Sequence, residues 1–304
     1  MQGTTTSVRT AGRLSGSQVA EAELDPAWRP WVRLLDIALD SANDAAWADA
    51  VPELSEASSG APLLHGTVIR VDARRVRQLV RELLREAAAH AEAHGAQGAR
   101  LTRPGPRRLD ALGALRGAIV QDGEAIERVA ERAGADAGTL SAVAPLATIA
   151  ILRACATRFR DRIPEDWRHG YCPVCGAWPT LVEIRGLERN RRLRCGRCSS
   201  DWPIPVLRCP FCSEINHDKL HALLPEGAEQ TRRVDVCDTC KGYIKGISTL
   251  QAAPLRALAI TDLATIELDL IAQERGYERP SHVGFPLSLD VVRASASAAV
   301  PGAG

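Results

Sequence analysis

The sequence predicts an α+β protein: an N-terminal all-α helical domain, then tandem zinc-ribbon or rubredoxin-like small β units, then a C-terminal helix. Three observations predict it. Apolar residues recur at the helical period in the first half, eight of the nine cysteines lie between Cys172 and Cys240, and the helical period returns after Gly246. We expect a disordered start (1–20), a helical domain (21–165), a double four-cysteine metal-binding rubredoxin-like domain (166–250), a C-terminal helix (251–281) and a tail (282–304).

The first half is predicted helical because its apolar residues form a stripe. The stretch "DARRVRQLVRELLREAAAHAEAH" places Val76, Leu79, Val80 and Leu83 at three- and four-residue steps, opposite arginines and glutamates. Pro145 should kink or start the last of the helices that follow. Those helices are expected over 108–120, 123–133 and 137 to about 162, and a short extended segment over 66–71.

Composition limits the class of protein. The chain has 304 residues, 45% of them hydrophobic and 25% charged, as soluble globular proteins do. A formal net charge of +1 selects neither nucleic acid nor a membrane as partner. The start has no apolar signal region, and the longest apolar stretches fall short of the roughly 20 residues that cross a bilayer. We therefore expect a cytoplasmic protein with no membrane partner.

The cysteines of the middle region form four pairs, each with two residues between its members. The gaps between successive pairs are 19, 10 and 24 residues. The first gap has the usual spacing of a four-cysteine metal site, and the second is short enough to link two units. Consecutive pairing is favoured, and a cross-braced arrangement stays open. The candidate metal ligands are Cys172, Cys175, Cys195, Cys198, Cys209, Cys212, Cys237 and Cys240.

This spacing has a chemical reason. Two cysteines three apart on a tight turn direct both sulfurs into one concavity, and Gly176 supplies the positive φ that such a turn needs. Two turns joined by a hairpin provide four sulfurs at about 2.3 Å from a tetrahedral metal. A site closed by four thiolates is structural or transfers electrons, and it does not activate water. We expect two metal ions, zinc or iron, and no catalytic residue.

Other interpretations of the cysteines are weaker. Disulfides are disfavoured because cytosolic thiols stay reduced. Redox pairs of the thioredoxin type follow a strand at the start of a helix, and that context is missing here. Cys155, alone in a helical segment, is interpreted as a small buried hydrophobic residue.

The arginine-rich stretch "RGLERNRRLRCGRC" holds six arginines and one glutamate. We interpret it as a solvated hairpin, with a contact surface for an acidic partner or RNA as the alternative. Nucleic acid is disfavoured because no aromatic residues interleave the arginines. His217 and His221 are interpreted as surface residues, and no phosphate-binding loop or nucleophile elbow occurs.

Four cysteine-bearing stretches, "YCPVCGAWP", "LRCGRCSSDWPI", "LRCPFC" and "VDVCDTCKGYIK", together with "APLLHG" and "TDLATIELDLIAQERGY", carry a resemblance. From about Leu24 to Leu289 the chain resembles the formate dehydrogenase accessory protein (FdhE) family. The sequence departs from that family in its long start and in "GFPLSLDVV" with the residues after it.

The resemblance implies a cytoplasmic, non-enzymatic accessory or maturation factor required for active formate dehydrogenase. It implies association with the catalytic subunit of that molybdenum or tungsten enzyme, and metal binding by the eight paired cysteines, with iron reported for the family. Two alternatives stay open: a rubredoxin-like iron electron carrier or redox sensor, and a zinc-ribbon nucleic-acid binder. The sequence leaves the oligomeric state open.

Overall fold

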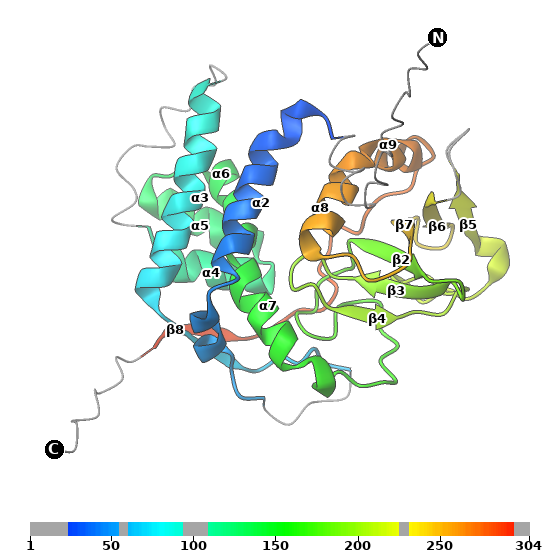
Figure 1. The fold of residues 1–304 in the computed structure, drawn as a ribbon, viewed down its shortest axis with the longest axis horizontal. Coiled ribbons are helices and arrows are strands. Elements are labelled where there is room, and N and C mark those ends of the chain that lie inside the picture. Colours follow the sequence, from blue (N-terminus) through cyan, green and yellow to red (C-terminus); the bar gives the residue numbers. More distant parts are fainter. Residues whose placement is uncertain (1–23, 55–59, 94–108, 225–230, 295–304) are drawn as a thin grey trace, which may run out of the picture.

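The computed structural model describes residues 24–54, 60–93, 109–224 and 231–294. A helical part and a sheet part lie side by side, and two C-terminal helices lie over the sheet part (Figure 1). This arrangement confirms the predicted α+β class, with helices first, a sheet-rich cysteine region second and helices again at the end.

The helical part is built from six α-helices and short 3-10 turns in the described residues. Asp110, Asp122 and Asp136 cap three of the helices, because each side chain accepts a hydrogen bond from the backbone N–H three residues on. The elements are η1 (Pro26–Trp28), α2 (Arg29–Ser41), η2 (Ala45–Ala50), α3 (Ala73–Ala93), α4 (Ala111–Val120), α5 (Gly123–Ala133), α6 (Ala137–Ala147), α7 (Ile149–Arg158) and η4 (Arg160–Arg162).

The helix expected over 137–162 is interrupted at Thr148, between α6 and α7, three residues after Pro145, where the sequence predicted a kink or a helix start. Pro145 cannot donate a backbone hydrogen bond, and the Thr148 hydroxyl donates to its carbonyl over 2.7 Å. By length and composition alone, the 22 helical residues from 137 to 158 are long and apolar enough to cross a membrane. No apolar stretch of that length was expected from the sequence. Of the apolar window within these residues, 61% is buried in the protein, as in the core helix of a folded domain.

The sheet part contains one six-stranded sheet of order β4-β3-β2-β7-β6-β5. Its two units, expected as separate tandem ribbons, are fused because β2 pairs in parallel with β7, Leu181 opposite Lys245. All its other pairings are antiparallel. The elements are β2 (Leu181–Arg185), β3 (Asn190–Arg194), β4 (Asp201–Pro203), η5 (His217–Lys219), β5 (Leu220–Leu223), β6 (Arg232–Cys237) and β7 (Tyr243–Thr249).

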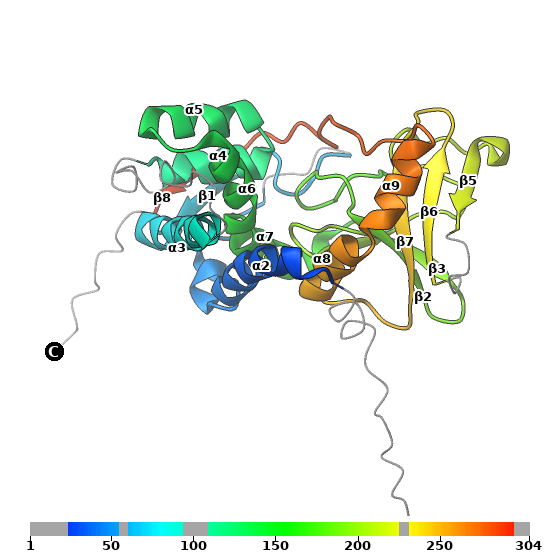
Figure 2. The ribbon, with the colours of Figure 1, turned by 90° about the horizontal axis from the view of Figure 1, so that it is seen from above.

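The C-terminal segment differs from expectation in two ways. The predicted helix over 251–281 is two helices, α8 (Leu255–Ala264) and α9 (Ile266–Glu274), broken at Thr265. The predicted tail over 282–304 contains β8 (Asp290–Arg293), which pairs in parallel with β1 (Val68–Val71). After α9 the chain runs back across the molecule to reach the helical part (Figure 2). The expected disordered start (1–20) and the last ten residues of the expected tail (295–304) lie outside the residues that the structure describes.

One hydrophobic core runs through both parts. It includes Leu35 and Leu83 of the helices, Cys172 and Cys195 of the first cysteine unit, and Leu258 of α8. Arg256 of α8 also pairs with Asp36 of α2, with Nε 2.7 Å from Oδ1. The boundary expected near residue 165 is therefore not a break in packing.

Candidate metal centres

Each cysteine pair lies on a tight turn closed by the same backbone hydrogen bond. The N–H of the first cysteine donates to the carbonyl five residues on, at distances of 2.8 to 3.0 Å. The four bonds run from Cys172 to Ala177, Cys195 to Ser200, Cys209 to Glu214 and Cys237 to Gly242. This repeat shows that the four turns are copies of one local structure.

The residue after the second cysteine of every pair has a positive φ. Only the first pair has glycine there, as the sequence predicted, and the positive φ in the other three turns was not predicted. The residues are Gly176 (71°), Ser199 (68°), Ser213 (65°) and Lys241 (55°). Non-glycine residues rarely adopt a positive φ, so the residue type at these three positions does not predict it. The signal that could have predicted it is the position itself, directly after each CxxC pair.

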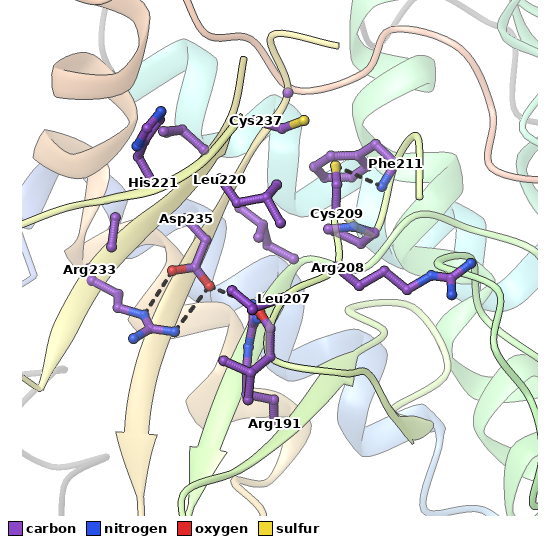
Figure 3. Close-up of a pocket in the computed structure, with 16 residues that line it drawn as sticks. Arg191, Leu207, Arg208, Cys209, Phe211, Leu220, His221, Arg233, Asp235 and Cys237 are labelled. Atoms are coloured by element: carbon purple, nitrogen blue, oxygen red, sulfur yellow. Dashed lines mark hydrogen bonds and ion pairs between the residues drawn. The ribbon is translucent and has the colours of Figure 1, made fainter. Parts of the chain in front are cut away.

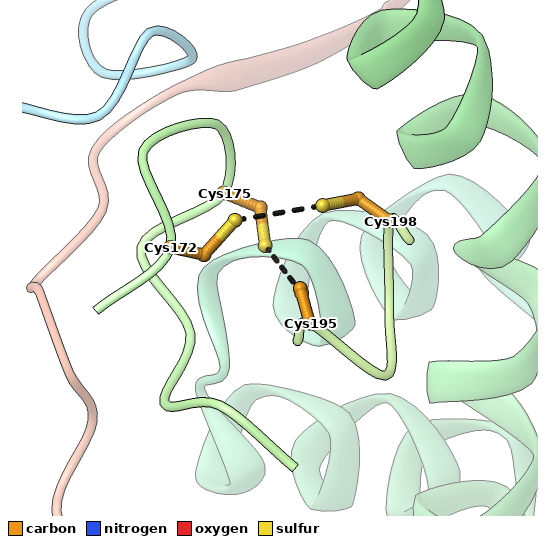
Figure 4. Close-up of side chains that lie close together, drawn as sticks. All are labelled: Cys172, Cys175, Cys195 and Cys198. Atoms are coloured by element: carbon orange, nitrogen blue, oxygen red, sulfur yellow. Dashed lines mark hydrogen bonds between the residues drawn. The ribbon is translucent and has the colours of Figure 1, made fainter. Parts of the chain in front are cut away.

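The first cluster joins Cys172, Cys175, Cys195 and Cys198 (Figure 4). The Sγ atoms of Cys172 and Cys198 lie 3.5 Å apart, and those of Cys175 and Cys195 lie 3.6 Å apart. The first three side chains are 0% exposed and the fourth is 1% exposed. This cluster is therefore sealed within the shared core.

The second cluster joins Cys209, Cys212, Cys237 and Cys240. The Sγ–Sγ distances are 3.7 Å for Cys209 and Cys240 and 3.6 Å for Cys212 and Cys237. Cys209 and Cys237 are buried, but Cys212 and Cys240 are exposed. The second cluster thus opens to solvent on one side.

These distances fit a tetrahedral metal. Four sulfurs at 2.3 Å from one ion stand about 3.8 Å from each other, whereas a disulfide needs about 2.05 Å. Within each cluster, all four sulfurs lie within 4.8 Å of one another. The grouping is the consecutive one, and each cluster could hold one ion. The donor set alone does not choose between zinc and iron.

Protonation differs among the thiols. Burial raises the pKa of Cys172 and Cys198, whereas hydrogen bonds from the other three thiols hold the pKa of Cys175 well below its ordinary value. In the second cluster, burial raises the pKa of Cys240 to about 11. Burial also opposes ionisation of Cys237, but backbone N–H groups of the turn outweigh it and lower that pKa.

Segments far away in sequence support the first cluster. Leu63 N donates to Pro173 O over 2.8 Å, and Leu64 N donates to Val174 O over 3.1 Å. On the other side, Phe285 N donates to Gly176 O over 2.9 Å. The first turn therefore lies between the "APLLHG" segment and the segment that precedes β8.

The arginine-rich hairpin is paired within the protein, so its interpretation as a solvated hairpin is wrong for most of its arginines. Arg191 Nη2 lies 2.6 Å from Asp235 Oδ2, Arg192 pairs with Asp201, and Arg194 pairs with the fully buried Glu183. Arg197 donates to the Ile119 carbonyl at the end of α4 over 3.2 Å. Since these guanidinium groups are already engaged, they offer little to nucleic acid.

The remaining candidates have ordinary surroundings. Cys155 is 0% exposed in the helical core, and burial raises its pKa to about 12. The His217 side chain is 76% exposed, and His221 lies 2.9 Å from Asp238. Neither histidine belongs to a metal-ligating group in the part of the chain that the structure describes.

Comparisons with known proteins match this chain to FdhE proteins. A family model described as the FdhE C-terminal domain matches residues 207–285. An FdhE homolog of Aquifex aeolicus is 31% identical over 135 residues, which cover 42% of this chain and 47% of that protein. One of Stutzerimonas stutzeri is 37% identical over 111 residues, covering 36% and 35%. The FdhE protein of Escherichia coli K12 is 31% identical over 113 residues, covering 36% of each.

The chain thus matches less than half the length of these curated relatives. A solved structure covers more: the crystal structure of the FdhE protein from Pseudomonas aeruginosa aligns with 90% of this chain and 93% of its own, with a TM-score of 0.52 and 22% identity. At that identity the likeness shows a shared fold.

Proposed function

The chain belongs to the FdhE family, and on this premise we propose that it is a non-enzymatic accessory or maturation factor for formate dehydrogenase. It acts in the cytoplasm and binds the catalytic subunit of that molybdenum or tungsten enzyme. The observation that carries this proposal is the pair of four-cysteine clusters, because closed thiolate sites stabilise structure or transfer electrons and leave no position for a substrate.

In this proposal the eight clustered cysteines hold two metal ions, and the ions supply rigidity to the turns that carry them. The shared core then fixes the sheet part relative to the helical part, so the client meets one rigid surface. The residues named as ligands are Cys172, Cys175, Cys195, Cys198, Cys209, Cys212, Cys237 and Cys240.

Two measurements test the proposal. Elemental analysis of anaerobically purified protein should give two ions per chain, and Cys240→Ser should reduce that number to one. The matched control is Cys155→Ala, the one cysteine outside the clusters, which should keep two ions. Affinity purification from anaerobic cells should recover the formate dehydrogenase catalytic subunit. Turnover of a small molecule by the isolated chain would contradict the proposal.

One observation favours a second function, electron transfer through an iron-loaded second cluster. Cys212 and Cys240 are exposed, so an ion held there lies close to solvent and to any redox partner. This function requires iron-type visible absorption and a reversible one-electron couple. A colourless zinc protein with full accessory activity would exclude it.

A further inference from the structure

A cavity of about 160 Å³ lies beside the second cluster (Figure 3). Cys209 and Cys237 form part of its lining, so it adjoins the cluster on the buried side. Its other walls are mainly apolar and come from the loop before Cys209, from the turn between Cys209 and Cys212, and from β5, β6 and β7. These apolar residues include Val206, Leu207, Phe211, Leu220 and Ile244.

The charged side chains on the floor of the cavity are paired with one another. Asp235 pairs with two guanidinium groups, since its Oδ2 lies 2.6 Å from Arg191 Nη2 and its Oδ1 lies 2.8 Å from Arg233 Nε. Arg208, at the rim, has no ion-pair partner within the described ranges, and its guanidinium extends away from the Asp235 pairs. Arg208 is therefore the cation at this cavity that can meet a carboxylate of a ligand.

The loop at the mouth of the cavity is held in place while its apolar side chains face solvent. Arg191 donates to the carbonyls of Pro205 and Val206. The Val206 and Leu207 side chains are nonetheless 66% and 54% exposed. These two adjacent apolar residues on an ordered loop offer a partner an apolar surface beside the cavity.

The neighbouring sheet edge suits an extended chain. β5 is the last strand of the six, and no strand pairs with its outer side among the residues that the structure describes. The opposite edge strand, β4, ends in Pro203, which cannot donate a ladder hydrogen bond. An unblocked edge next to a side-chain cavity is the arrangement used to bind extended peptides.

We propose that this cavity, with Leu207 and Arg208 at its mouth, binds an extended segment of the client protein that carries one large apolar side chain next to a carboxylate. The volume argues for a single side chain, because about 150 Å³ accommodates one benzene-sized group and small-molecule sites usually exceed about 300 Å³. The charge of Arg208 at the mouth argues for the carboxylate. This proposal rests on the function proposed above and names the surface that performs it.

The test uses two leucines of equal exposure on opposite sides of the sheet. Leu207 and Leu270 are each 54% exposed, and Leu270 belongs to α9, which packs on the Val234 and Val236 side of the sheet. Leu207→Asp should reduce recovery of the formate dehydrogenase catalytic subunit about tenfold, as the loss of an anchoring contact does. Leu270→Asp should stay within about twofold. Both variants should keep two ions and the wild-type unfolding temperature.

A photo-crosslinking residue at position 207 should form an adduct with the catalytic subunit, and one at position 270 should not. Arg208→Glu should weaken binding and reduce its salt dependence. If Leu207→Asp recovers as much catalytic subunit as the wild type does, or if only position 270 forms a crosslink, the proposed binding surface is wrong. The proposed accessory function would not be affected by that result. A crosslink from position 207 to a second copy of this chain would overturn the proposed binding surface in favour of a dimer contact. If the wild-type chain recovers no catalytic subunit, both proposals fail.

Discussion

Lys245 Nζ lies 2.6 Å from Asp269 Oδ2, and the lysine side chain is only 1% exposed. The same ammonium group lies 2.8 Å from Asp262 Oδ1 and donates to the Asp262 carbonyl. These contacts fasten β7 to both sides of the break between α8 and α9. The chain has only three lysines against 35 arginines, and here a compact ammonium group meets several oxygens at once.

We expect Lys245→Met to lower the free energy of unfolding by about 3 kcal/mol, because it removes the buried ammonium group from Asp262 and Asp269 and leaves them only the more exposed Arg279 as a cationic partner. Denaturant titration followed by circular dichroism measures this. Lys241→Met is the matched control: Lys241 also pairs with an aspartate, Asp238, but on the surface, where solvent screens the pair, so its loss should be clearly smaller than that of Lys245→Met. Equal losses in the two variants would contradict the role of Lys245.

The same network predicts a dependence of stability on pH. Burial opposes ionisation of Asp269, but the hydrogen bond from Lys245 and the charge of Arg279 outweigh it and lower its pKa. A carboxyl whose pKa is lower in the folded state stabilises the fold above its unfolded pKa of about 3.9, and this contribution is lost as pH falls through the folded pKa.

We therefore expect the difference in unfolding free energy between wild type and Lys245→Met to shrink as pH is lowered from 7 toward 3. Using the difference cancels the loss of metal in acid, which affects both proteins. Denaturant titrations at several pH values measure it. A difference that is constant over this range would show that Asp269 is not stabilised by Lys245.

The two clusters should exchange metal at different rates. A chelator reaches the second cluster through Cys212 and Cys240, whereas the first cluster is sealed in the core. We expect two kinetic phases of release, one ion each, detected with a chromogenic chelator. Cys240→Ser should abolish the fast phase and keep the helical circular dichroism.

Cys172→Ser provides the counterpart. It should abolish the slow phase, and it should also lower the unfolding temperature of the helical part, because Cys172 belongs to the core that the helices share. A single release phase of two ions, or equal effects of the two variants on helical content, would contradict the prediction that the first cluster is sealed in the core and the second is open to solvent.

Gly176→Ala should destabilise the first turn by about 1–2 kcal/mol. Its φ is 71°, and an added Cβ would lie 3.1 Å from Phe285 Cβ and 3.2 Å from Pro62 Cγ. Ser213→Ala is the control, because the same turn position in the second cluster already carries a side chain, so its effect should be within about 0.5 kcal/mol. Thermal unfolding of the two metal-loaded variants distinguishes them, and equal midpoints would contradict the prediction.

How far the sequence predicted the structure depends on the range of the interactions involved. The helix α5 was predicted to the residue, because Asp122 caps its start and the apolar period is local. The grouping of the cysteines was also predicted, because a CxxC turn forms within a few residues and a hairpin of suitable length joins two of them. The interruption at Thr148 was anticipated from Pro145, but its position was not, because nothing in the apolar period marks Thr148.

By itself the sequence determined the class of the fold, the four turns and the two candidate metal centres, because each depends on neighbouring residues. Only the tertiary structure decided that β2 pairs with β7, that β8 returns to β1, and that the arginines of the hairpin are paired inside the protein. It also decided that one cluster is sealed and the other open. These outcomes depend on contacts between segments separated by tens to hundreds of residues, which leave no period or spacing in the chain.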